Sequence, residues 1–140
     1  MLRRKRGRRR ERKCDTTGRM EHSPRFDKLC ADARANVKEI SSDEVADRIA
    51  KGSSFELIDV REESEFAKGR IKAARHIGRG ILERDIEKAI PDLDADIVLY
   101  CGGGYRSALS AESLQKMGYR NVKSMVGGWR EWTSKGLPTE

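Results

Sequence analysis

The sequence predicts an α/β fold with a mainly parallel central sheet and helices on both faces. Short apolar segments of strand character alternate along the chain with helical segments, an order typical of parallel sheets whose strands are joined through helices. Residues 97–100, Ile-Val-Leu-Tyr, form a continuous apolar run, which is typical of a strand buried on both faces. We therefore expect this strand to lie in the centre of the sheet.

The first half of the predicted domain begins with a helix over residues 24–35. Its apolar side is expected to hold Phe26, Leu29, Cys30 and Ala33. The next elements, in order, are a strand at 37–40, a helix capped by Ser41 or Ser42 and running to Ala50, a strand at 55–60, a helix at 62–68 that ends at Gly69, and a crossing segment at 71–77.

The second half alternates in the same way. Trp129 and Trp132 are three residues apart in the last predicted helix, a spacing typical of core packing, with ligand stacking as the alternative. The elements, in order, are a helix at 81–90 before Pro91, the apolar strand at 97–100, a helix at 107–117 that ends at Gly118, a strand at 121–125, and the last helix, which follows Gly127-Gly128.

Length and charge divide the chain into a basic tail, residues 1–22, and one domain, residues 23–140. A length of 140 residues is typical of a single domain. Residues 1–20 hold ten Lys and Arg and two acidic residues, a net charge of +8, whereas the whole chain carries +7, so the remainder sums to −1. Like charges this dense repel one another, and we expect the tail to stay unfolded. The nearly neutral domain gives no reason to expect nucleic-acid binding.

Three interpretations of the tail stay open. Residues 1–19 are a solvated segment with no specific role, or the translation start is placed too early, because Met20 opens a more ordinary sequence. The third is an arm that binds nucleic acid or another anionic surface.

Composition excludes several classes of protein. The sequence has no apolar run of the roughly 20 residues that a membrane helix needs, and no apolar stretch follows the charged start as in a secretory signal. Cys14, Cys30 and Cys101 are widely spaced, which argues against a disulfide framework and fits a reducing cytoplasm. His22 and His76 are far apart, so we expect no metal site and no cofactor. We expect a monomer, because nothing marks the apolar patch of an obligate dimer.

The segment after the apolar strand carries the strongest functional pattern. It reads Cys101-Gly102-Gly103-Gly104-Tyr105-Arg106, with a helix expected from about Ser107. Ligands of open α/β sheets bind beyond the carboxyl ends of strands. The glycines allow a tight turn whose N–H groups point inward and, with the positive end of the following helix, bind an anion. This setting favours the thiolate form of a cysteine, so Cys101 is a candidate nucleophile. The alternative is a structural cysteine at a strand end.

Three neighbours complete this predicted site. Arg106 supplies a cation at the rim, and Ser107 caps the helix or donates a hydrogen bond. The ring of Tyr105 is expected to form a wall.

These residues resemble a single-domain rhodanese, of the thiosulfate sulfurtransferase type, in which a loop of the same length from Cys to Arg follows the central strand. Further segments resemble that family in the same order, and the resemblance runs from about residue 37 to residue 140. They are Asp59-Val60-Arg61 with Glu65-Phe66, Gly69-Arg70-Ile71 leading to Ala74-Arg75-His76-Ile77, Gly127-Gly128-Trp129 with Trp132, and Gly136-Leu137-Pro138. The chain departs from the family at Arg70, where His is common, and at Ala73-Ala74, where Gly-Ala is common.

The resemblance implies a rhodanese-like three-layer fold and a sulfurtransferase. Cys101 would take a sulfane sulfur from thiosulfate or a related sulfur donor as a persulfide and pass it to cyanide, a thiol or a protein acceptor. Backbone amides of residues 102–106 would hold the terminal sulfur, and Arg106 and Arg61 would help to hold the anionic sulfur donor. The alternative is a non-enzymatic rhodanese-like module that carries sulfur, senses it or binds a partner.

The spacing of Cys101 and Arg106 bears on the atom that the loop holds. Four residues separate them, whereas cysteine phosphatases on related folds use a loop one residue longer that fits the oxygens of a phosphate. The shorter loop favours sulfur over phosphate, with phosphatase and arsenate reductase as lesser alternatives.

Other residues are assigned more than one role. Asp59 accepts backbone N–H groups or pairs with Arg61, as a supporting residue of the site or as part of the scaffold. Arg61 belongs to a structural ion pair or to the site of the sulfur donor. His76 resembles a scaffold position. The roles of Cys14, which lies in the tail, and Cys30 stay open: neither is near Cys101 in the sequence, and the alternative is that one of them resolves the persulfide as a disulfide.

Overall fold

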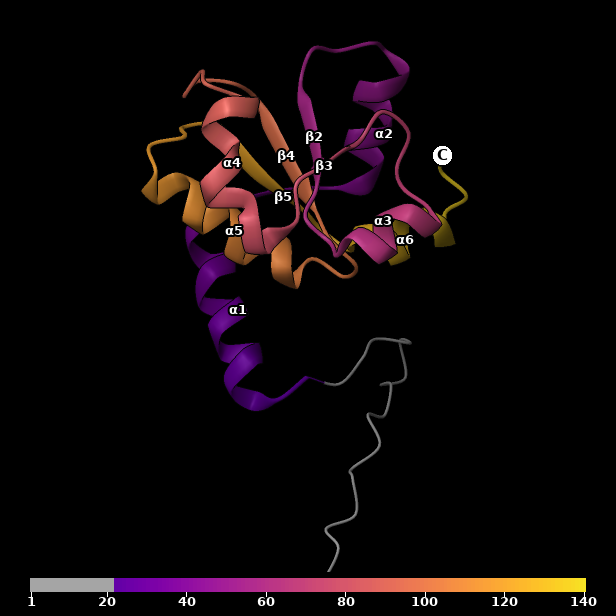
Figure 1. The fold of residues 1–140 in the computed structure, drawn as a ribbon. Helices are drawn as coiled ribbons and strands as arrows, with labels where there is room; N and C mark the ends of the chain where they lie inside the picture. Colours follow the sequence, from indigo (N-terminus) through magenta and orange to yellow (C-terminus); the bar gives the residue numbers. More distant parts are fainter. Residues whose placement is uncertain (1–21) are drawn as a thin grey trace, which may run out of the picture.

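Five parallel strands form one sheet, in the order β1-β5-β4-β2-β3, in a computed structural model that describes residues 22–140 (Figure 1). The basic tail other than His22, with Cys14 and Met20, lies outside the described residues. The predicted parallel α/β fold is confirmed, and the apolar strand β4 lies in the middle of the sheet as predicted. The strands are β1 (Lys38–Ile40), β2 (Glu56–Asp59), β3 (Arg75–His76), β4 (Ile97–Tyr100) and β5 (Val122–Met125).

Helices connect these strands. Ser41 caps α2, because its hydroxyl oxygen accepts the backbone N–H of Glu44 at 3.1 Å. The helices are α1 (Pro24–Asn36), α2 (Ser42–Ala50), α3 (Glu63–Lys68), the 3-10 turn η1 (Arg79–Ile81), α4 (Leu82–Ala89), α5 (Tyr105–Lys116) and α6 (Gly128–Ser134). Among residues 22–140, no helix has the length and apolar character needed to span a bilayer.

The sheet is covered on both faces, which gives three layers. Alternate residues of β4 enter different apolar clusters, as the two-residue period of a strand requires. Ile97 and Leu99 pack in the cluster that holds Ile86 of α4 and Leu114 of α5, whereas Val98 and Tyr100 pack in the cluster of α2 and α6. Figure 1 shows α4 and α5 on one side of the sheet and α2, α3 and α6 on the other.

Helix α1 packs against the outer side of α5 along a narrow stripe. Cys30 and Ala33 are buried there with Ala108 and Leu109 of α5. The prediction that Leu29 lies on this apolar side is wrong, because its side chain is 54% exposed. A stripe this narrow is filled by the two small residues, so the neighbouring leucine turns to solvent.

Candidate active site

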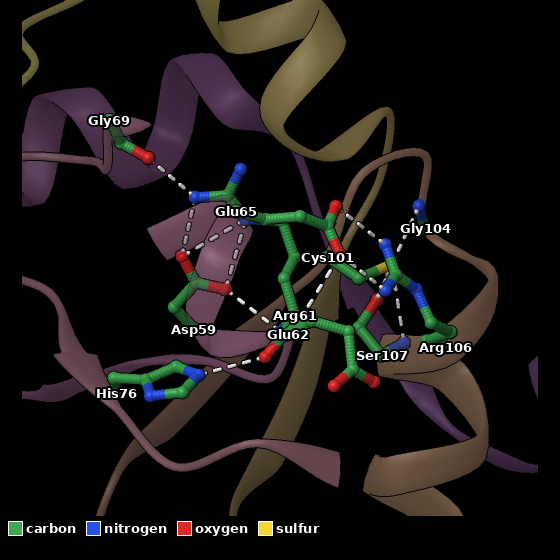
Figure 2. A network of polar contacts seen from close by, with 10 residues as sticks. All are labelled: Asp59, Arg61, Glu62, Glu65, Gly69, His76, Cys101, Gly104, Arg106 and Ser107. Atoms are coloured by element: carbon green, nitrogen blue, oxygen red, sulfur yellow. Dashed lines mark hydrogen bonds and ion pairs between the residues drawn. The ribbon is translucent and has the colours of Figure 1, made fainter. Parts of the chain in front are cut away.

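Cys101 directly follows β4 and is buried, with 1% of its surface exposed. Two backbone N–H groups point at its sulfur: Gly104 donates to Sγ at 3.1 Å and Ser107 donates at 3.4 Å (Figure 2). Both groups belong to the start of α5, where unpaired N–H groups and the positive end of the helix dipole gather. The geometry stabilises negative charge on this sulfur.

The amino end of α6 holds the loop in this shape. The carbonyls of Cys101 and Gly102 accept N–H bonds from Trp129 at 2.7 Å and from Arg130 at 3.1 Å. A side chain at Gly128 would place its Cβ 2.4 Å from the Cys101 carbonyl oxygen, and the φ angle of Gly128 is +57°. Glycine is therefore required where α6 approaches the loop. With these two carbonyls turned toward α6, the next amides are free to face the sulfur.

The three glycines of the loop serve different purposes. Gly104 has a φ angle of +93° and occupies the N-cap position of α5, a conformation that favours glycine. A Cβ at Gly102 would lie 3.3 Å from Nη2 of Arg106, and one at Gly103 would make an ordinary contact with the ring of Tyr105. Gly104 is therefore needed for the left-handed turn, and Gly102 allows the side chain of Arg106 to lie close to the loop.

Helix α5 begins earlier than predicted, at Tyr105 and not near Ser107. Tyr105 and Arg106 therefore belong to the first turn of the helix and not to an extended loop. Of the two roles expected for Ser107, capping the helix is wrong, because Gly104 occupies that position. Gly104 is the N-cap in a left-handed conformation that glycine tolerates, so the helix begins at the next residue.

Two serines continue the polar contacts from the sulfur into the protein. The hydroxyl oxygen of Ser107 lies 3.4 Å from Sγ of Cys101 and 2.8 Å from the hydroxyl oxygen of Ser124 on β5. Both serines are buried. The thiol of Cys101 donates to Ser107; once the thiol is deprotonated, Ser107 can donate to the sulfur while Ser124 donates to Ser107. The sequence did not single out Ser124, although a serine within a buried strand marks a polar group that needs a partner.

Arg106 is paired with Glu65 of α3. Its Nη1 lies 2.9 Å from Oε1, and its Nη2 lies 3.2 Å from Oε2, in the two-pronged geometry typical of arginine and carboxylate. The two side chains are 33% and 37% exposed. Hydrogen bonding to Arg106 lowers the pKa of Glu65, and the same contact raises the pKa of Arg106. The cation expected at the rim is therefore balanced by a carboxylate that the sequence did not identify as its partner.

Arg61 and Asp59 form a second pair, which is buried. Arg61 Nη2 lies 2.7 Å from Oδ2 of Asp59, and the two side chains are 3% and 0% exposed. The same Nη2 donates to the carbonyl of Gly69 at 2.7 Å, and the guanidinium lies over the ring of Trp129. Asp59 also accepts the backbone N–H of Arg61 at 2.9 Å. Of the two roles left open for Arg61, this geometry favours the structural ion pair.

The remaining candidates lie around these pairs. His76 donates from Nε2 to the carbonyl of Arg61 at 2.8 Å and stacks on Phe66, so it supports the scaffold. Trp132 is fully buried, in accord with core packing. The ring of Tyr105 packs edge-on against that of His22, which precedes α1.

Cys30 and Cys101 are both free thiols, and no disulfide joins them. Burial raises the pKa of the Cys30 thiol, which argues against a reactive role for Cys30. Within residues 22–140, no group of three or more His, Cys, Asp or Glu side chains is arranged to hold a metal ion.

Comparison with known proteins identifies the family of this chain. Residues 41–135 match the family model described as a rhodanese-like domain. A sulfurtransferase of Allochromatium vinosum is 33% identical over 102 residues, which cover 73% of this chain and 94% of that protein. A Bacillus subtilis protein provisionally named a sulfur carrier is 31% identical over 103 residues, and the matched part spans 54% of its length.

A solved structure from Rhodopseudomonas palustris shares the fold with a TM-score of 0.78 and 27% identity, covering 88% of this chain and all of that one. It is described as a protein of unknown function and a possible tyrosine phosphatase.

Proposed function

The chain belongs to the rhodanese-like family of sulfurtransferases, and from that premise we propose that it moves a sulfane sulfur from thiosulfate or a related sulfur donor to a thiophilic acceptor through a persulfide on Cys101. The observation that carries the proposal is the convergence of two backbone N–H groups on Sγ of a buried cysteine at the carboxyl end of the central strand. This arrangement stabilises a thiolate and, one atom further out, a persulfide anion.

The reaction has two steps. The Cys101 thiolate attacks the outer sulfur of thiosulfate, a new S–S bond forms, and the S–S bond of thiosulfate breaks as sulfite leaves with the electron pair. Amides of residues 102–106 hold the terminal sulfur of the Cys101 persulfide. An acceptor nucleophile such as cyanide or a thiol then attacks that sulfur and regenerates the Cys101 thiolate. The Cys101 thiol donates to the hydroxyl oxygen of Ser107, and in the thiolate the Ser107 hydroxyl can turn and donate to Sγ while Ser124 donates to Ser107.

Two features favour sulfur over phosphate. Four residues separate Cys101 from Arg106, which is one fewer than in cysteine phosphatases. A phosphatase also needs its arginine to face a dianionic phosphate, whereas Arg106 is engaged with Glu65 through both Nη groups. Both features support the transfer of a sulfur atom.

A second candidate function is a sulfur carrier without significant turnover, which the Bacillus subtilis relative favours. The carrier and the enzyme share the persulfide and differ in whether an acceptor releases it repeatedly. Because widely spaced cysteines suit a reducing compartment, we propose that the protein acts in the cytoplasm, where thiol acceptors are available. We propose that it acts as a monomer without a cofactor.

Turnover with thiosulfate and cyanide separates these functions. We expect the protein to release many equivalents of sulfite and thiocyanate, Cys101→Ala to release none, and the matched control Cys30→Ala to behave like the wild type. Release of a single equivalent of sulfite would assign the carrier function. Absence of any sulfite release with intact wild-type protein contradicts the proposed thiosulfate activity.

A further inference from the structure

Two arginine–carboxylate pairs belong to the network of polar contacts that contains Cys101. Asp59 is paired with Arg61, and Glu65 is paired with Arg106 (Figure 2). The charges cancel within each pair. A bound anion can therefore accept hydrogen bonds from the backbone N–H groups of the loop. Neither arginine of these two pairs offers it an unbalanced positive charge.

Arg106 lies against the loop that holds the reacting sulfur. A Cβ at Gly102, the residue after Cys101, would lie 3.3 Å from Nη2 of Arg106, which places the guanidinium directly over the loop. Arg61, in contrast, directs its Nη2 to the Gly69 carbonyl and to Asp59. Of these two arginines, Arg106 is therefore the one placed to attract an anionic sulfur donor, and Glu65 opposes that attraction.

Glu65 is fixed in this position by its own helix. Its Oε1 also accepts the backbone N–H of Glu62 at 3.2 Å, and Glu62 in turn receives an N–H bond from residue 65, which together form a capping box at the start of α3. If the Glu65 carboxylate moved away from Arg106, it would also lose its hydrogen bond to the N–H of Glu62. The capping box therefore holds this carboxylate beside Arg106.

We propose that Glu65 determines the specificity of the site for the sulfur donor: by pairing with Arg106 it disfavours dianionic thiosulfate relative to a singly charged persulfide. The inference rests on the proposed function, because it concerns sulfur transfer to Cys101. The Glu65 carboxylate lies at the same edge of the loop as Arg106, so it repels a second negative charge more than a single one.

The two sulfur donors differ in the charge of the group that leaves. With thiosulfate, the Cys101 thiolate takes the outer sulfur and sulfite leaves with two negative charges. With an organic persulfide, R–S–S⁻, the thiolate takes the same sulfur and a thiolate R–S⁻ leaves with one. Both reactions conserve charge and require no oxidant or reductant. The charge that develops beside Arg106 and Glu65 is larger in the first.

The test compares two sulfur donors with the wild type and Glu65→Gln. The rate constant for gain of one sulfur on Cys101 is measured by intact mass with thiosulfate and with the persulfide of 2-mercaptoethanol, whose only charge is on sulfur. We expect Glu65→Gln to raise the ratio of the thiosulfate rate to the persulfide rate about tenfold, which corresponds to the removal of about 1.4 kcal/mol of repulsion. A change in the reactivity of Cys101 itself affects both sulfur donors and cancels in this ratio.

Matched variants assign the effect to the charge at position 65. Gln keeps an oxygen that can accept the N–H of Glu62, so the helix cap is preserved. Glu63→Gln removes the same charge from an exposed position of α3 and should leave the ratio unchanged, and Glu65→Asp should keep it close to the wild type. An unchanged ratio in Glu65→Gln overturns the inference. Absence of sulfur gain from both donors in the wild type overturns the proposed function instead.

The wild-type protein gives an independent answer if the variant does not fold. Sulfate is an unreactive dianion with the charge of thiosulfate. At equal ionic strength, we expect sulfate to slow the alkylation of Cys101 by iodoacetamide no more than chloride does, as followed by peptide mass mapping. Specific protection by sulfate would mean that the site holds a dianion despite Glu65, and would overturn the inference.

Discussion

Two arginine–carboxylate pairs lie beside Cys101, and they differ in burial and not in chemistry. The closest contacts are similar, 2.7 Å for Arg61 with Asp59 and 2.9 Å for Arg106 with Glu65. The first pair is almost completely buried, whereas about a third of each side chain in the second is exposed. The buried pair cannot meet a substrate without opening the core, and the exposed pair can. The same contact therefore serves the scaffold in one place and the site in the other.

The energetic consequences follow from burial. A buried charge that loses its partner keeps the full cost of its removal from water. An exposed charge that loses its partner is solvated again, so such a pair contributes little to stability. Variants of the two pairs should therefore differ most in the free energy of unfolding.

The largest effect is expected for the buried pair. Asp59→Asn leaves the Arg61 guanidinium without a counter-charge among Tyr100 and Trp129, and should lower the free energy of unfolding by about 3–5 kcal/mol. Chemical denaturation measures this difference. As a control, Glu56→Gln breaks the exposed pair with Arg75 and should cost less than about 1 kcal/mol. If both variants lost the same free energy of unfolding, burial would not separate the two kinds of ion pair, and this prediction would be wrong.

A smaller, pH-dependent effect is expected for Glu65. Because Arg106 lowers the pKa of folded Glu65 below its ordinary value of 4.5, the pair stabilises the protein above that pH and loses its contribution as the pH falls through the folded pKa. Urea denaturation of the wild type and Glu65→Gln should differ by less than about 1 kcal/mol at pH 7, since solvent screens the pair. The two proteins should converge as the pH falls toward 3. A difference that grows on acidification would contradict this account.

The sequence predicted those parts of the molecule that depend on local pattern. The apolar run 97–100 identified the central strand, and Cys101 with Gly104 identified the sulfur-facing turn, because strand burial and turn conformation are set by neighbouring residues. The pairing of Arg106 with Glu65 could not be predicted in the same way. The two residues are 41 positions apart, and only the folded sheet brings α3 to the start of α5.

The errors have similar physical causes. The α5 helix was predicted to start late because the glycine run resembles a loop, whereas the left-handed turn at Gly104 starts the helix at once. Leu29 was predicted to pack because a leucine at helical spacing usually does, whereas α1 buries only Cys30 and Ala33 against α5.

The central claim is that Sγ of Cys101 accepts one sulfur atom. Intact mass spectrometry after mixing with thiosulfate, cysteine persulfide or mercaptopyruvate tests it most directly. We predict a gain of about 32 Da, located on the peptide that contains Cys101, lost on addition of a thiol and absent in Cys101→Ser. An unchanged mass with all three sulfur donors, or a gain located on Cys30, would contradict the claim.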